Sequence, residues 1–137
     1  MRFLTLTLLA VLCAAIAPAE VFETTPTDQI ERGRYLANYA SMCVQCHSPH
    51  DRTGDLIEGQ HFTGNAIPFA SPFPDGPVKW APRAPALIRL PGWSEEDFVY
   101  LLMNGKRPNG SRPMGPMPQF RLSRADASAI AAYLKSL

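Results

Sequence analysis

The sequence has few charged residues, and the two signs nearly cancel. Asp, Glu, Lys and Arg make up only 18% of the 137 residues, with 13 basic side chains against 12 acidic ones. This balance argues against a general nucleic-acid-binding surface, which needs basic residues to neutralise phosphates. Hydrophobic residues make up 46% of the chain, so it is not a disordered charged tail. The length fits about one domain, and we find no internal repeat.

A strand pattern is also missing, because no segment alternates clearly between apolar and polar residues. The chain instead contains 14 prolines, well above the usual share of ~5%. Prolines and glycines concentrate in residues 48–92 and again in residues 106–121. An irregular segment as long as the first is unusual in a compact domain. We therefore expect it to wrap a large rigid group that supplies the missing core.

Cysteine is scarce, and the three present are too few for a disulfide scaffold. Cys13 lies in an apolar stretch that follows Arg2 and precedes Ala17-Pro18-Ala19, the pattern of a secretory signal peptide and its cleavage site. The stretch is too short to span a bilayer, which takes about 20 residues. An uncleaved N-terminal anchor is the alternative.

These features predict three regions and an exported, periplasmic protein. The regions are a signal peptide at residues 1–19, a polar lead-in at 20–27 and one domain at 28–137. Only Cys43 and Cys46 remain in the exported chain.

Three helices are predicted. The first covers residues 27–42, with Thr27 or Asp28 as its cap and a face of small residues that includes Gly33, where a second helix can cross closely. The second begins after Ser94 and ends at Asn104-Gly105. The third runs from its Ser123 cap to the C-terminus. The apolar stripes of the second and third helices are predicted to be buried: Phe98, Leu101, Leu102, Ala127, Ile130, Ala131, Leu134 and Leu137.

The chemistry is concentrated at residues 43–47, Cys-Val-Gln-Cys-His. C-x-x-C-H is the signature of covalent haem c attachment. Two thiols three residues apart on a helical turn reach the two vinyl groups of a porphyrin, and His47 is then carried to the iron. A zinc site would need two more ligands, a thioredoxin-like pair would need a βαβ context, and a Cys43–Cys46 disulfide is the remaining alternative.

A second axial ligand is needed if the iron only carries electrons. Met114 and Met117 lie in a stretch stiffened by three prolines, which could hold a weak thioether donor in place. His61 is a further candidate, whereas His50 is too close to His47 to reach the other face of the ring. Met103 is expected to pack in the core instead.

The residues resemble a class I c-type cytochrome of the small monohaem form, over about residues 28–137. The resemblance is carried by Gly33-Arg34-Tyr35-Leu36, the C-x-x-C-H run, Gly92-Trp93-Ser94, Met117-Pro118 and Ala132-Tyr133-Leu134, in family order. It implies an all-α cytochrome c fold, about three main helices with long Pro/Gly-rich loops around one covalently bound haem c. It also implies that the first and last helices cross at Gly33 and Tyr133.

The resemblance further implies the roles of the site residues. Cys43 and Cys46 would hold the haem, and His47 and Met117 would ligate iron, with Met114 as second choice. A proline carbonyl in residues 48–91 would accept the His47 ring N–H, and Trp80 and Arg83 would face the haem propionates.

The function that follows is electron transfer rather than catalysis. The chain is most similar to cytochromes that serve periplasmic dehydrogenases, so its partner would be a redox protein. We expect no binding to nucleic acid. We expect association with a membrane only through that partner or through an uncleaved leader. The alternative is a haem enzyme or sensor with an open sixth site, such as a peroxidase, a sulfur-compound oxidase or a gas sensor. A basic stretch predicts an acidic docking partner: Lys106, Arg107, Arg112, Arg121 and Arg124, with no acidic residue between positions 98 and 125. The alternatives are ordinary solvated charges and, for two of the arginines, pairing with the haem propionates.

Overall fold

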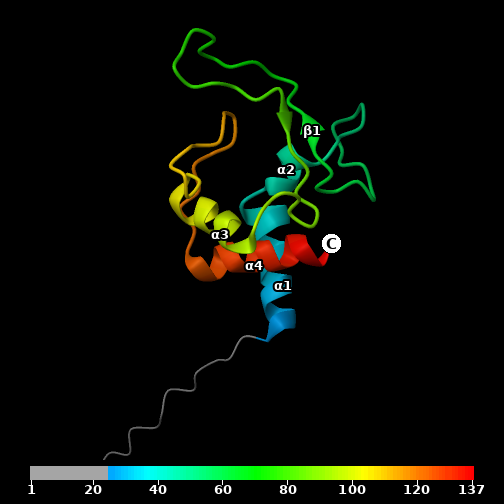
Figure 1. The fold of residues 1–137 in the computed structure, drawn as a ribbon. Coiled ribbons are helices and arrows are strands. Elements are labelled where there is room, and N and C mark those ends of the chain that lie inside the picture. Colours follow the sequence, from blue (N-terminus) through cyan, green and yellow to red (C-terminus); the bar gives the residue numbers. More distant parts are fainter. Residues whose placement is uncertain (1–24) are drawn as a thin grey trace, which may run out of the picture.

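The computed structural model describes residues 25–137. The predicted signal peptide and most of the polar lead-in lie outside these residues. The elements, in chain order, are α1 (Pro26–Tyr35), the π-helix η1 (Leu36–Ala40), α2 (Cys43–His47), β1 (Asn65–Ala66), β2 (Arg83–Ala84), α3 (Glu95–Asn104) and α4 (Arg124–Ser136). The fold is all-α, as predicted, with three longer helices joined by irregular segments (Figure 1).

The first helix differs from the prediction at its start and at its end. Its cap is Thr25, whose hydroxyl accepts from the backbone N–H of Asp28 while the Asp28 carboxylate accepts from the backbone of Thr25. The expected continuous helix over 27–42 is broken into α1, η1 and α2. The side-chain amide of Asn38 donates to the carbonyl of Arg34, 2.8 Å away, and so competes for the acceptor that an α-helix gives to the Asn38 backbone N–H.

The other two long helices begin and end close to their predicted limits. The hydroxyl of Ser94 accepts a hydrogen bond from the backbone N–H of Asp97, and the hydroxyl of Ser123 accepts one from the backbone N–H of Asp126. Each donor–acceptor distance is 3.1 Å. Gly105 ends α3 in the left-handed conformation, with φ of 63°. The predicted apolar stripes are buried except Leu137, which packs against the core half-exposed.

The close helix crossing predicted at Gly33 is present between α1 and α4 (Figure 1). Gly33 is buried, and a methyl group there would overlap the carbonyl of Ala129 and approach the β-carbon of Tyr133. An ion pair between Arg32 and Asp126 also links the two helices. α4 packs against α3 as well, so it is the central helix of the fold.

The long segment between α2 and α3 contains a minimal sheet, which corrects the expectation of no strand. β1 and β2 pair antiparallel, with Asn65 opposite Ala84 and Ala66 opposite Arg83. Two residues per strand are too short to show an alternating pattern, so the sequence carries no signal for them. The loop between these strands projects away from the helices (Figure 1) and exposes Phe69, Phe73 and Val78.

Phe62 anchors this segment to the helical core. Its side chain is fully buried and meets the ring of Tyr133 edge-on at a centroid distance of 5.9 Å. Its backbone N–H donates to the buried hydroxyl of Ser48, and its carbonyl accepts from Leu87 and Ile88. An irregular chain is therefore held in a defined path by a few buried contacts. Among residues 25–137, no helix combines the length and apolar character needed to cross a bilayer.

Candidate haem site

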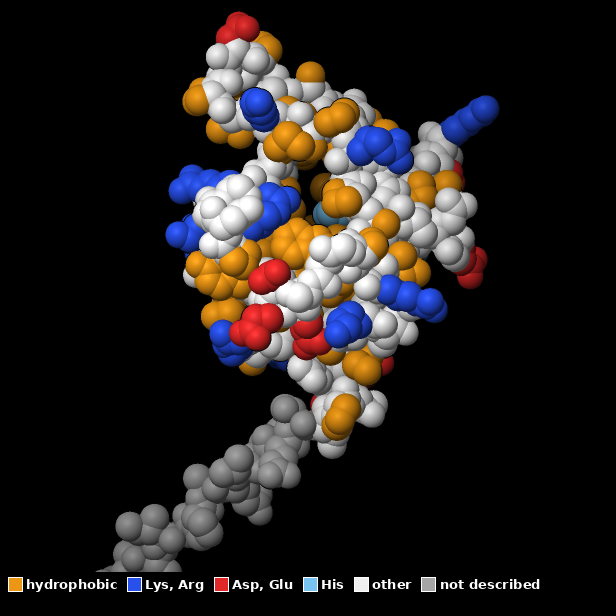
Figure 2. Space-filling view, in the orientation of Figure 1, with side chains coloured by type: hydrophobic (Ala, Val, Ile, Leu, Met, Phe, Trp, Pro, Cys, Tyr) orange, Lys and Arg blue, Asp and Glu red, His pale blue; other side chains and the backbone are white. Residues whose placement is uncertain are grey.

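A mainly apolar cavity of about 410 Å³ lies between α2, α3 and the loops on either side of them. It is open to solvent as a hollow in the surface, with a histidine side chain visible inside it (Figure 2). The cavity brings together most of the residues that the sequence assigns to a haem. Its walls include Cys43, Cys46, His47, Arg83, Pro85, Leu87, Trp93, Phe98, Leu101, Leu102, Arg107, Met114, Met117 and Phe120.

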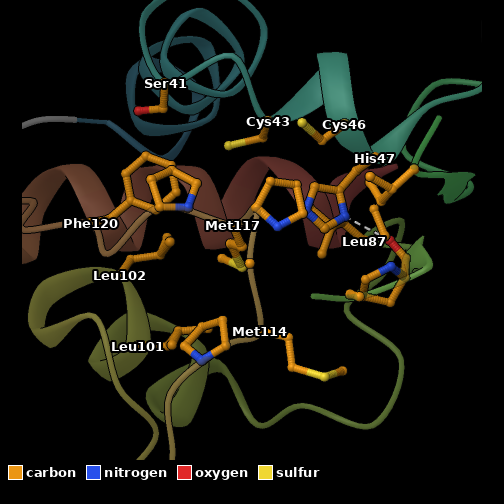
Figure 3. Close-up of a pocket in the computed structure, with 18 of the residues that line it drawn as sticks. Ser41, Cys43, Cys46, His47, Leu87, Leu101, Leu102, Met114, Met117 and Phe120 are labelled. Carbon is orange, nitrogen blue, oxygen red and sulfur yellow. Dashed lines mark hydrogen bonds between the residues drawn. The ribbon is translucent and has the colours of Figure 1, made fainter. Parts of the chain in front are cut away.

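The two cysteines lie at one side of the cavity, on the single turn of α2 (Figure 3). Their thiols are free, Cys43 half-buried and Cys46 exposed, so the disulfide alternative is not realised. Met42, in the left-handed conformation with φ of 51°, separates η1 from α2 and turns the chain so that both thiols face the cavity. Burial raises the pKa of the Cys43 thiol to about 11, which keeps that thiol protonated at neutral pH.

His47 projects into the cavity from the end of α2 (Figure 3) and is only 7% exposed. Its Nδ1 lies 2.7 Å from the carbonyl oxygen of Pro85. Because a carbonyl can only accept, Nδ1 must carry the proton, and Nε2 is left with a free lone pair. Burial lowers the pKa of His47, although the Pro85 hydrogen bond acts in the opposite direction, so the neutral imidazole is favoured. The predicted proline carbonyl acceptor is therefore Pro85.

The two loop methionines form the wall across from α2 (Figure 3). Met117 is half-buried, whereas Met114 is 49% exposed. Their loop is fixed by two backbone hydrogen bonds to the segment before β2. The N–H of Ala81 donates to the carbonyl of Gly115 over 2.7 Å, and the N–H of Gly115 donates to the carbonyl of Lys79 over 2.9 Å.

Met42 also lines this cavity, whereas His50, His61 and Met103 do not. His61 is exposed and lies outside the lining, next to Phe62. His50 lies 3.3 Å from the side-chain oxygen of Gln45, also outside the lining. Met103 packs against the core, as expected. Within residues 25–137, no group of three or more His, Cys, Asp or Glu side chains is placed so that it could hold a metal ion.

The charged and polar groups around the cavity differ in part from those singled out in the sequence. Arg83 lines it, but Trp80 does not; the Trp80 ring lies against Gly115, and its buried Nε1–H has no acceptor within residues 25–137. Arg107 also lines the cavity; it belongs to the basic stretch, in which the sequence left open whether two of the arginines pair with the haem propionates instead of a partner. Its position depends on a loop conformation that has no local signature.

These residues fit haem c. The donor set is two free thiols three residues apart, one imidazole with an available Nε2, and thioether sulfurs on the wall across from it. The mainly apolar lining suits a porphyrin.

Comparison with known proteins gives the same assignment. Residues 28–134 match the family described as cytochrome c oxidase, cbb3-type, subunit III. The chain is 30% identical over 128 residues to the fructose dehydrogenase cytochrome subunit of Gluconobacter japonicus, covering 85% of this chain and 24% of that protein. It is 34% identical over 118 residues to a nicotinate dehydrogenase subunit of Pseudomonas putida, covering 80% of this chain and 9% of that one.

A third relative is a protein named diheme cytochrome c-type from Cereibacter sphaeroides. It is 29% identical over 123 residues, which cover 86% of this chain and 38% of that protein. The chain thus spans well under half the length of each of these relatives. Because the family match extends over most of its residues, the chain belongs to this cytochrome c family: it is a class I c-type cytochrome, an electron carrier that uses haem c.

Proposed function

We propose that this chain is an exported monohaem cytochrome in which Cys43 and Cys46 hold the haem covalently and His47 and Met117 ligate its iron. The observation that supports this most is the cavity itself, which has the C-x-x-C-H turn on one side and Met117 on the other. The haem would supply an iron that gains and loses one electron with both axial positions filled. No substrate then needs to reach the metal.

The chain's own residues would set how this site behaves. The Pro85 carbonyl holds the His47 ring in one tautomer and one orientation, which is the usual role of a partner behind a ligating histidine. The loop hydrogen bonds at Gly115 fix the backbone next to Met117. A thioether opposite an imidazole raises the reduction potential relative to other axial pairs. The apolar walls would limit the contact of a bound haem with water, which acts in the same direction.

Met117 is favoured over Met114 by its burial as well as by the family pattern. A ligating thioether must point into the cavity and be shielded from solvent, and Met114 is about half exposed. One C-x-x-C-H run in the chain supports a count of one haem. The predicted leader at residues 1–19 supports export to the periplasm, where c-type cytochromes can mature.

A dehydrogenase is the proposed electron donor. Two of the relatives are named as subunits of dehydrogenases, one for fructose and one for nicotinate. Both are much longer than this chain, so the resemblance supports the class of partner and not its substrate. The chain would act either as a free carrier or as one subunit of such a complex.

The first test is direct. The protein is produced in a cell with a c-type maturation system, and its mass is measured after denaturation. We expect the mass of one haem to be added to the wild type, and we expect Cys43→Ala and Cys46→Ala each to abolish stable holoprotein. A wild-type chain without covalent haem would refute the proposal.

The optical spectrum of the oxidised protein separates the two functional classes. Thioether ligation gives a weak charge-transfer band at the red end of the visible spectrum, and a filled sixth site gives a low-spin iron. A high-spin oxidised spectrum that changes on adding cyanide, or a reduced protein that binds carbon monoxide, would instead support the enzyme or sensor with an open site.

A further inference from the structure

Arg107 is a partly buried cation in the wall of an otherwise apolar cavity. It lies in the turn just after α3, where its backbone N–H donates to the carbonyl of Ser111 over 2.8 Å. The neighbouring Lys106 is exposed and does not line the cavity. The two adjacent basic residues therefore have different surroundings.

The guanidinium of Arg107 is held in place from two sides. Its central carbon lies 5.5 Å from the centre of the Trp93 ring, in cation–π contact. One terminal nitrogen, Nη1, donates long hydrogen bonds of 3.4 Å to the hydroxyl of Ser111 and the carbonyl of Arg112. Trp93 itself is fixed by edge-on contact with Phe98 at 5.8 Å. The charge is thus positioned at the cavity by rigid groups.

No carboxylate within residues 25–137 comes within 4.0 Å of Arg107, and its Nε and Nη2 have no hydrogen-bond partner there. A guanidinium offers five N–H donors in a planar fork, and its partial burial costs free energy unless an anion faces it. The fork matches the two oxygens of a carboxylate. The free nitrogens of Arg107 therefore point to a carboxylate that the described chain does not provide.

We propose that Arg107 binds a propionate carboxylate of the haem and so positions the haem and raises its reduction potential. This rests on the proposed function, since it takes the cavity as the haem site. Propionates are the anionic groups of a haem, so they are the groups that a cation in this wall would meet. Arg83, the other cation of the lining, is exposed and has no such anchoring contact.

An acidic residue of a partner protein is the alternative anion, and the burial of Arg107 argues against it. Docking charges act best when exposed, as Lys106 is, because their contribution is to steer the encounter. Arg107 is instead stacked on the ring of Trp93 and lines the cavity. A charge held in this way is suited to stabilise an anionic group that is bound permanently inside the cavity.

The test uses the purified holoprotein with three variants. Arg107→Gln removes the charge and the fork, Arg107→Lys keeps the charge and removes the fork, and Lys106→Gln is the control with the same charge change one residue away. Two quantities are measured: the reduction potential by spectroelectrochemistry, and the propionate-bending band of the haem by resonance Raman spectroscopy.

We expect Arg107→Gln to shift the propionate band and to lower the potential by at least about twice as much as Lys106→Gln, because a partly buried charge is screened less than an exposed one. Arg107→Lys is expected to shift the band while it keeps most of the potential. Lys106→Gln should leave the band in place. If Arg107→Gln does not form holoprotein, the position of the propionate band in Arg107→Lys still tests the inference.

A propionate band at the wild-type position in every Arg107 variant obtained would overturn the inference, as would equal potential falls for Arg107→Gln and Lys106→Gln. In either case the wild type still carries covalent haem, and the proposed function stands. A wild type without covalent haem refutes the proposed function and this inference together, so the two failures are distinguishable.

Discussion

At the scale of single residues, the choice between two methionines three positions apart decides how the iron would be ligated. Met114 and Met117 share one loop and both line the cavity. The prolines of the loop do not separate them, whereas the family pattern of a methionine followed by a proline favours Met117. Their different exposure also separates them, because a ligand sulfur must be withdrawn from solvent.

We predict that Met117→Ala abolishes the thioether–iron band of the oxidised protein and lowers the reduction potential, since it removes the sulfur that favours the reduced state. Met114→Ala is the matched control and should leave both properties close to those of the wild type. Optical spectra and spectroelectrochemistry measure both. The reverse result would make Met114 the ligand, and no effect of either substitution would direct attention to His61.

The sequence predicts the attachment residues of the site well because C-x-x-C-H is a local motif whose spacing is imposed by the cofactor. It predicts the supporting residues less well. The acceptor for the ring N–H of His47 was predicted only as a proline carbonyl. Arg107 was not singled out among the arginines of the basic stretch, and the supporting roles of Ser48 and Phe62 were not predicted. Their roles come from contacts between distant segments, such as the Ser48 hydroxyl and the backbone of Phe62, 14 residues away.

At the scale of helices, the same distinction holds. The caps of α3 and α4 were predicted correctly because Ser94 and Ser123 bond a backbone N–H three residues on. The break in the first helix was not predicted. It involves Asn38, whose side-chain amide contacts both the carbonyl of Arg34 and the hydroxyl of Tyr133 on α4. A tertiary contact of this kind leaves no trace in helical periodicity.

The crossing of α1 and α4 gives a prediction about stability. Gly33→Ala should lower the free energy of unfolding by about 1–3 kcal/mol or more, because the new methyl group overlaps the backbone carbonyl of Ala129. The loss should appear although alanine favours a helix over glycine by about 1 kcal/mol. Denaturant unfolding of the holoprotein measures it. Thr27→Ala, exposed in the same helix, is the control, and a Gly33→Ala protein as stable as that control would contradict the tight crossing.

At the scale of the whole molecule, the proportion of irregular chain follows from what the fold surrounds. The helices form a small core around α4, and the segment between α2 and α3 passes over the other side of the cavity. That segment has few anchors of its own, chiefly Phe62 and the two-residue strands. A bound porphyrin would supply the remaining apolar surface, and for this reason the sequence could predict a long loop without predicting its path.

The distribution of charge over the molecule leads to a prediction about docking. Lys and Arg side chains gather beside the hollow in Figure 2, and the basic stretch after α3 forms part of its rim. Within this stretch Arg107 lines the cavity. The residues that can contact a partner are therefore exposed ones such as Lys106 and Arg112. Exposed charges beside the point where electrons leave would attract an acidic partner and raise the rate of encounter.

We predict that the second-order rate of electron exchange with the native donor falls as ionic strength rises, since exposed charges are screened over about 8 Å at physiological salt. Charge reversal by Lys106→Glu and Arg112→Glu should lower the association rate at low salt by roughly tenfold, which is within the range attributed to steering. The reduction potential should change much less.

Arg52→Glu is the control, because Arg52 is exposed but lies outside the basic stretch and the cavity lining. Stopped-flow mixing over a range of salt concentrations measures the rates. If the rate is independent of salt and the Arg52 variant behaves like the other two, docking is not electrostatic, and the exposed apolar loop between β1 and β2, with Phe69, Phe73 and Val78, becomes the surface to substitute next.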